Sequence, residues 1–262
     1  MIKYKSVEKS DYDVIAVFDF GLEGLKKNRE LENMIRKIDD RTTIVISHFD
    51  VDHINNIGRF DLKTTCRWLF PEHEPTSQEG NLLYHELIRI ASKKSISGTH
   101  VFSYKTPFSL SSYLRINQNT EKKKDYRYQS TSINAKCIIS SLNINGKNVL
   151  IPADALYRDF PDDVFLLQYN YVLIPHHGCR YESPISHSHY CDSVSKIVSS
   201  NPIGVLLSGR AGAKHGHANT NHLKWYPTVV SFTDSLFFVS KSHRDCSYSC
   251  TQCLDDYYAI VF

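Results

Sequence analysis

The sequence contains no apolar run close to the roughly 18 residues that a helix needs to span a bilayer. Residues 1–13 carry six charged side chains and therefore lack the apolar core of a signal peptide. Excess charge is small as well: 31 basic and 28 acidic residues give a formal net charge of +3, which by itself does not indicate nucleic-acid binding. We therefore expect a cytoplasmic protein that does not contact a membrane.

A cysteine pattern typical of disulfide-rich proteins is also absent, because the seven cysteines are odd in number and irregularly spaced. We expect free or metal-bound thiols, as in a reducing compartment. Three of the cysteines lie close together beside a histidine, and four such ligands could form a closed structural zinc site. These residues are His243, Cys246, Cys250 and Cys253. Free cysteines in a loop are the alternative, and we favour it.

The composition is that of a globular protein, since 41% of residues are hydrophobic and 23% are charged. Short apolar runs alternate with longer amphipathic stretches, which predicts a layered α/β fold. No repeat and no Pro/Gly/Ser-rich linker interrupts the chain, so we expect a single domain over residues 1–262.

The expected strands are residues 13–19, 43–47, 133–144, 148–151, 171–175, 204–208, 235–240 and 257–262. The expected helices are residues 22–38, 81–92, 155–168 and 188–198. An Asn-Gly pair between two apolar stretches predicts a hairpin at residues 143–148. Residues 96–130 are polar, and we expect them to form loops.

A dense group of histidines and aspartates follows the β-branched run 43–47: His48, Asp50, Asp52 and His53. Side chains in an extended chain repeat their direction every two residues, so the first three project from one side of the strand end. Imidazole and carboxylate ligands suit zinc, manganese or iron. We expect His48 and Asp50 to hold one ion, and Asp52 and His53 a second. A polar turn in which Asp52 caps a helix explains such a dense group less well.

Two further groups end expected strands. Asp154 follows residues 148–151 and either caps the next helix or supplies a carboxylate that spans both ions. His176 and His177 follow the strand at 171–175 and precede Gly178, which indicates a tight turn. Neighbouring side chains diverge, so we expect one of the two histidines, with His177 preferred, to bind metal and the other to contact substrate.

With these residues the sequence resembles the metallo-β-lactamase fold superfamily, whose signature is His-x-His-x-Asp-His after a strand. Aspartate at the second position, preceded by serine, is most similar to the hydrolase domain of the ComEC-type competence proteins. Further similar segments are VFDFG at 17–21, VLIPADA at 149–155, VLIPHHG at 172–178 and LSGRAGAKHGHA at 207–218. The sequence departs from the family pattern in three ways. The family's N-terminal element is missing, and three motif positions carry other residues, namely Ala153, Cys179 and Ala218. The third motif lacks a clear histidine, and His100 is the only candidate.

The resemblance implies a four-layer αββα sandwich of two mixed sheets and a centre of two divalent ions, Zn²⁺ or Mn²⁺. It gives Asp154 the position of the bridging aspartate and Asp19 a hydrogen-bonding role behind the centre. His217 would contact the substrate or transition state. Asp52 is expected to be catalytic, because it could orient the attacking water or accept its proton.

These expectations point to a metal-dependent hydrolase, and a phosphodiesterase or nuclease is the preferred class. The polar segment carries basic residues interleaved with tyrosines, a composition that suits a phosphate backbone and its bases. The candidate substrate-binding residues are Lys122, Lys123, Lys124, Arg127 and Lys214. A solvated loop is the alternative for this segment. The alternative functions are hydrolysis of a small ester, lactone or amide, and binding of a protein partner in a bacterial defence assembly.

Overall fold

The computed structural model describes part of the chain. The described residues are 2–4, 13–19, 35–54, 67–71, 75, 77–92, 99–102, 108–109, 114–118, 133–144, 146–157, 160–179, 188–202, 204–206, 222 and 225–226. The chain divides into two compact units, which we call unit 1 (residues 1–104 and 259–262) and unit 2 (residues 105–258). Each unit is described by itself. Within the described residues, no helix combines the length and the apolar character needed to cross a bilayer.

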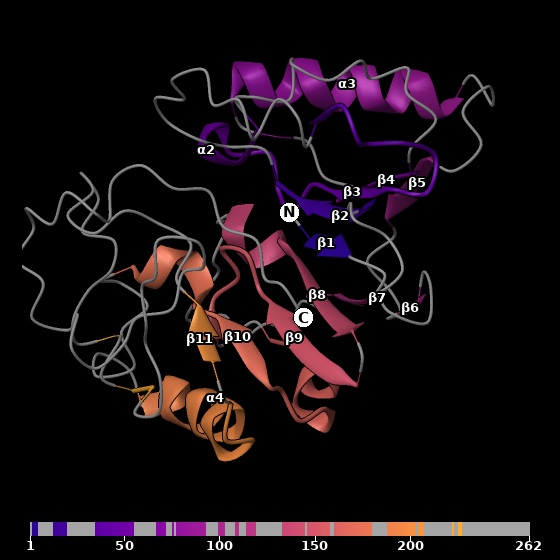
Figure 1. Cartoon of the computed structure of the whole chain (residues 1–262). Helices are drawn as coiled ribbons and strands as arrows, with labels where there is room; N and C mark the ends of the chain where they lie inside the picture. Colours follow the sequence, from indigo (N-terminus) through magenta and orange to yellow (C-terminus); the bar gives the residue numbers. More distant parts are fainter. Residues whose placement is uncertain are drawn as a thin grey trace, which may run out of the picture. The chain divides into compact units, whose positions relative to one another are not determined.

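Unit 1 contains a five-stranded mixed sheet with the strand order β1-β2-β3-β4-β5. The strands are β1 (Ile2–Tyr4), β2 (Asp13–Phe18), β3 (Thr43–Val45), β4 (Arg67–Pro71) and β5 (Thr99–Phe102). β1 is antiparallel to β2, and the other pairs are parallel. The helices are α2 (Val51–Ile54) and α3 (Gln78–Ser92). Leu83 and Leu87 of α3 pack with Ile44, Trp68 and Phe70 of the sheet, so α3 covers one face of it (Figure 1).

Unit 2 contains a six-stranded mixed sheet with the order β11-β10-β9-β8-β7-β6. The strands are β6 (Phe108–Ser109), β7 (Leu114–Gln118), β8 (Ile138–Ile144), β9 (Lys147–Ile151), β10 (Tyr171–Leu173) and β11 (Gly204–Leu206). β9, β10 and β11 are parallel to one another, and the pairs from β6 to β9 are antiparallel. Val194 and Ile197 of helix α4 (Ser188–Ser199) join the buried core of this sheet. Mixed sheets with packed helices confirm the predicted α/β class.

The predicted hairpin is confirmed. β8 and β9 pair through Asn143 with Asn148 and Ile144 with Lys147, which leaves a two-residue turn. Gly146 has φ +75°, the left-handed conformation that such a turn requires. The helices predicted at 81–92 and 188–198 are also confirmed, each within three residues of the observed ends.

The helix predicted at residues 155–168 is wrong. Ala155 and Leu156 are not helical, and the only helical segment of more than one residue among the described residues of 155–168 is the 3₁₀ helix η4 (Asp162–Leu166). Pro161 precedes η4 in an extended conformation, with φ −67° and ψ 150°. Proline has no N–H to donate and its ring blocks the preceding turn, so a continuous helix cannot form through it.

The prediction of loops over residues 96–130 is wrong for residues 99–102, 108–109 and 114–118, which form β5, β6 and β7. The other residues of this range lie outside the described ones. Residues 114–117 are alternately apolar and polar, which is the pattern of a strand with two different faces. β4 was not predicted, and residues 133–136 form the 3₁₀ helix η2 (Ile133–Lys136) in place of a strand. The strands predicted at 235–240 and 257–262, and most of the helix predicted at 22–38, lie outside the described residues.

Candidate functional site

Asp19 lies immediately after β2, beside the end of the parallel strand β3. Its backbone N–H donates to the Val45 carbonyl at 2.9 Å. Its carboxylate accepts two hydrogen bonds from Ser47, from the backbone N–H to Oδ1 and from the hydroxyl to Oδ2, each 2.7 Å long. The carboxyl ends of these two strands are therefore joined through one partly buried carboxylate.

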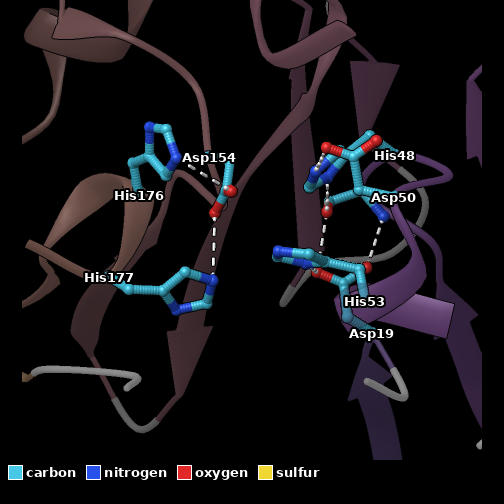
Figure 2. A network of polar contacts seen from close by, with 8 residues as sticks. Asp19, His48, Asp50, His53, Asp154, His176 and His177 are labelled. Carbon is cyan, nitrogen blue, oxygen red and sulfur yellow. Dashed lines mark hydrogen bonds and ion pairs between the residues drawn. The ribbon is translucent and has the colours of Figure 1, made fainter. Parts of the chain in front are cut away.

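Asp19 also contacts the histidines that follow β3. Nδ1 of His53 lies 2.8 Å from Asp19 Oδ2, and Nδ1 of His48 lies 2.9 Å from the Ser47 hydroxyl (Figure 2). Burial opposes ionisation of Asp19, but His53, His48 and the hydrogen bond from Ser47 outweigh it and hold the pKa of this carboxyl below its ordinary value. Asp19 is therefore an anion at neutral pH and accepts every hydrogen bond that it makes.

This charge fixes the tautomers of both histidines. The Ser47 proton points to Asp19, so the Ser47 oxygen accepts from Nδ1–H of His48. His53 likewise donates its Nδ1–H to Asp19. In the neutral form of either ring Nε2 carries the lone pair, and this is the form of histidine that binds a metal. The two ring centroids are 4.1 Å apart, and both rings are almost fully buried.

Asp50 contributes a carboxylate to the same group. Its Oδ2 lies 3.6 Å from Nε2 of His48. A hydrogen bond between these atoms would be about 2.7–3.2 Å long. Two ligands that are each about 2.0–2.2 Å from one tetrahedral ion lie roughly 3.4 Å apart. The observed separation is therefore closer to that of two ligands of one cation than to that of a hydrogen bond.

Unit 2 holds a second group with similar separations. Asp154 follows β9, and His176 and His177 lie in the 3₁₀ helix η5 (Pro175–Gly178) after the parallel neighbour β10. Nε2 of His176 is 3.5 Å from Asp154 Oδ2, and Nε2 of His177 is 3.4 Å from Asp154 Oδ1 (Figure 2). Each oxygen of this buried carboxylate thus faces a different imidazole at a ligand-to-ligand separation. The donor set and its spacing fit a divalent transition metal.

The backbone beside both groups is strained. Five described non-glycine residues have positive φ, and four of them adjoin these side chains: Asp19, Ala153, His176 and His177, with φ between 49° and 52°. This conformation costs about 1–2 kcal/mol for a residue with a Cβ. Such strain is concentrated at functional positions, where the surrounding contacts hold it in place.

Helix α3 supports the loop that carries His48 and Asp50. The Ser77 hydroxyl caps the helix by accepting the Gly80 N–H at 3.0 Å. A methyl group placed on Gly80 would lie 2.6 Å from the carbonyl oxygen of Phe49, 2.7 Å from Ser77 Oγ and 2.8 Å from Pro75 Cβ. Glycine therefore lets α3 approach the backbone between the two proposed ligands.

Gly80→Ala is expected to destabilise the protein even though alanine is the better helix former by about 1 kcal/mol. The added methyl group overpacks the contact with Phe49, at a cost of about 1–3 kcal/mol. Urea unfolding should show the lower stability. Glu79→Ala, at an exposed position one residue earlier, is the control and should change stability by about 0.5 kcal/mol or less. Equal stability of the two variants would mean that α3 does not hold the loop by close contact.

Several predicted site residues are not placed by the structure. The backbone of Asp52 lies in α2 and that of His100 in β5, but their side chains are not described. His217, Lys122, Lys123, Lys124, Arg127 and Lys214 lie outside the described residues. The same holds for His243, Cys246, Cys250 and Cys253. The sequence interpretation also missed His222, a fully buried histidine of unit 2 that bonds the carbonyl oxygen of Cys179, two residues after His177.

No protein-family model and no curated protein matches the chain. Solved structures that are similar to it include the following three. The metallo hydrolase Igni18 from the archaeon Ignicoccus hospitalis is 16% identical, with 70% of this chain and 69% of that chain covered and a TM-score of 0.40. Zn²⁺-bound PqqB from Methylobacterium extorquens is 9% identical, with coverages of 65% and 59% and a TM-score of 0.35. The archaeal metallo-β-lactamase superfamily protein ST1585 from Sulfolobus tokodaii is 12% identical, with coverages of 82% and 75% and a TM-score of 0.36. Fold does not fix function, so these similarities identify no activity.

Proposed function

We propose that the protein is a metal-dependent hydrolase. One observation carries the proposal: imidazole nitrogens and carboxylate oxygens lie 3.4–3.6 Å apart in three pairs, at the carboxyl ends of parallel strands. The hydrogen bonds of Asp19 and Ser47 support it further, because they orient His48 and His53 in the tautomer that binds metal. The resemblance to the metallo-β-lactamase superfamily, with its four-layer αββα sandwich, agrees with this ligand chemistry.

The proposed ligands are His48, Asp50, Asp52 and His53 of unit 1, and Asp154 with His176 or His177 of unit 2, and the proposed cofactor is two divalent ions, Zn²⁺ or Mn²⁺. Such ions lower the pKa of water and neutralise charge on the group that is attacked. Asp52 is the proposed acceptor of the proton from the attacking water. His217 is the proposed contact to the substrate.

The proposed substrate is a phosphodiester, with nucleic acid as the preferred class. Two features of the sequence support it: the similarity to the ComEC-type hydrolase domain, and the run of Lys122, Lys123, Lys124 and Arg127 with tyrosines between them. A cytoplasmic location and action beside a protein partner are part of the same proposal. A panel of single- and double-stranded DNA, RNA and a generic phosphodiester, each with Mn²⁺, Zn²⁺ or Mg²⁺, tests it. Hydrolysis of small esters or lactones by a metal-loaded protein that neither binds nor cuts nucleic acid would contradict it.

Two variants should separate binding from turnover. Replacing Lys122, Lys123 and Lys124 by alanine is expected to weaken nucleic-acid binding. The slope of log affinity against log salt concentration should also become smaller by about 2–3, because fewer counterions are released when three phosphate contacts are lost. Asp52→Asn should lower turnover about 10²–10⁴-fold while binding is retained, since general-base catalysis contributes a factor of this size. Titrations at several salt concentrations and single-turnover assays measure the two effects.

The control for the lysine variant is Lys147→Ala, which removes an exposed positive charge from the β8–β9 hairpin of the same unit. It should leave the salt slope unchanged. A triple-lysine variant that binds nucleic acid with the wild-type slope would exclude this segment as the phosphate contact.

A further inference from the structure

His222 lies in a buried polar network that the proposed chemistry does not use. The network consists of His222, Tyr157 and Tyr226, all with no exposed surface. Nε2 of His222 is 2.6 Å from the Tyr157 hydroxyl, which in turn bonds the Tyr226 hydroxyl. Nδ1 of His222 lies 3.2 Å from the carbonyl oxygen of Cys179. Three polar side chains are thus connected inside the apolar core of unit 2.

The protonation of this network follows from its surroundings. Burial lowers the pKa of His222 to about 4, so the ring is neutral at physiological pH. A carbonyl oxygen only accepts, so the single ring proton lies on Nδ1 and points to Cys179. Nε2 then accepts from the Tyr157 hydroxyl, and the Tyr157 oxygen accepts from Tyr226. Burial also raises the pKa of Tyr226, so its phenol keeps the proton that it donates.

The network ends on the loop of the two candidate ligands. Three consecutive residues of this loop, His176, His177 and Gly178, have positive φ. Both backbone polar groups of the next residue, Cys179, are hydrogen-bonded. Its N–H donates to the His176 carbonyl at 2.8 Å, and its carbonyl accepts from His222. The His176 N–H donates to the Ala153 carbonyl at 2.8 Å, next to Asp154. One series of hydrogen bonds therefore runs from the residue before Asp154 to His222.

We infer that His222 is a positioning residue for the metal centre: its Nδ1–H holds the Cys179 carbonyl and thereby keeps His176 and His177 in the left-handed conformation that directs both rings to Asp154. This inference rests on the proposed function, because it assigns a role toward the metal of that centre. It also accounts for the burial of His222 and of the Tyr157 and Tyr226 phenols in a mainly apolar core, where polar side chains are costly unless each is paired.

Two substitutions of His222 distinguish this role from simple packing. Asparagine places its amide nitrogen where Nδ1 of histidine lies, so His222→Asn keeps the donor to Cys179. Glutamine places its amide at the Nε2 position, so His222→Gln keeps the contact with Tyr157 and loses that donor. Zn²⁺ titration of the metal-free proteins, with Co²⁺ absorption spectra as a second readout, should show metal affinity near wild type for the asparagine variant. The glutamine variant should bind about 10–100-fold more weakly, the usual effect of losing a partner that orients metal ligands.

The outcomes separate the inference from the proposed function. If the wild-type protein binds no Zn²⁺ or Co²⁺, the metal centre itself is refuted and the inference with it. If the wild type binds but both variants lose affinity equally and in proportion to their stability, only the positioning role is refuted. Should neither variant fold, ¹⁵N-histidine NMR of the wild type with ¹³C-labelled cysteine carbonyl decides: a coupling between Nδ1–H and Cys179 supports the role, and an Nε2–H tautomer overturns it.

Discussion

Asp154→Asn is expected to abolish metal binding by the histidine pair of unit 2. The carboxylate directs one oxygen to each imidazole, at 3.5 Å for His176 and 3.4 Å for His177. Asparagine keeps the shape but replaces one oxygen by an amide nitrogen, which does not bind metal, and removes the negative charge. Metal affinity should fall at least about 100-fold, since partners that only orient a ligand already account for 10–100-fold. Metal analysis after dialysis and calorimetric titration with Zn²⁺ measure the loss.

The same variant should be as stable as the wild type, or more stable, when both are free of metal. Asp154 is 4% exposed, and a buried carboxylate is costly when no cation is bound beside it. Asp162→Asn, which removes an exposed carboxylate in the same unit, is the control and should change neither metal content nor stability. Full metal content in Asp154→Asn would remove Asp154 from the ligand set.

Asp19→Asn is expected to combine a large loss of stability with a loss of metal affinity. Asparagine tolerates the left-handed backbone at this position, where φ is +52°, so the effect comes from the side chain. One oxygen can still accept from the Ser47 N–H, but the amide would then present donors to the Ser47 hydroxyl and to His53. The free energy of unfolding should fall by about 2–4 kcal/mol, because hydrogen bonds to a charged acceptor are lost. His53 would also lose the partner that fixes its tautomer, so metal affinity should fall about 10–100-fold.

The pH dependence of stability should also change in Asp19→Asn. The pKa of Asp19 is below its ordinary value of 3.8 in the folded protein, so the ionised carboxylate stabilises the fold at neutral pH. This contribution is lost as the pH falls from about 5 through the folded-state pKa, and the variant should lack that part of the acid transition. Asp39→Asn is a matched control, because Asp39 also has a lowered pKa but pairs with Arg41 at the surface. Its loss should be about 1 kcal/mol or less. Equal losses of unfolding free energy in the two variants would contradict the proposed stabilisation by the hydrogen bonds of Asp19 to Ser47 and His53.

The sequence was a good guide where one short-range rule decides the structure. The Asn-Gly turn fixed the β8–β9 register, and the amphipathic periods of α3 and α4 located both helices. The sequence predicted the wrong secondary structure where apolar residues are completely buried, as in the helix expected at residues 155–168. Three completely buried residues are spaced as on one face of a helix: Tyr157, Phe160 and Val164. The extended Pro161 lies between the second and the third of them, so this spacing does not come from a continuous helix. Strand β7 did not follow from the sequence, because its apolar–polar alternation covers only four residues and lies within a polar segment.

The candidate site was predictable in its dense parts only. Histidines and aspartates directly after a strand are conspicuous, because the carboxyl ends of parallel strands meet at one edge of a sheet. Whether these residues bind metal stays a prediction. His222 gave no such signal: it is 43 residues from Cys179 and 65 from Tyr157, and no local pattern connects them. Its importance follows from burial and hydrogen bonding, which depend on the folded chain.

Ala153, the residue before Asp154, occupies a left-handed position, which glycine adopts far more readily than alanine. Glycine visits a wide range of backbone conformations, whereas alanine that has been forced into this region has few others nearby. The hydrogen bond from the His176 N–H to the Ala153 carbonyl adds a second restraint. The backbone before the Asp154 carboxylate is thus restrained before any cation binds, so part of the entropy of arranging this ligand is lost during folding and not during metal binding. A cation would therefore bind to a preorganised ligand, and the entropy lost during folding would lower the free energy of unfolding of the metal-free protein.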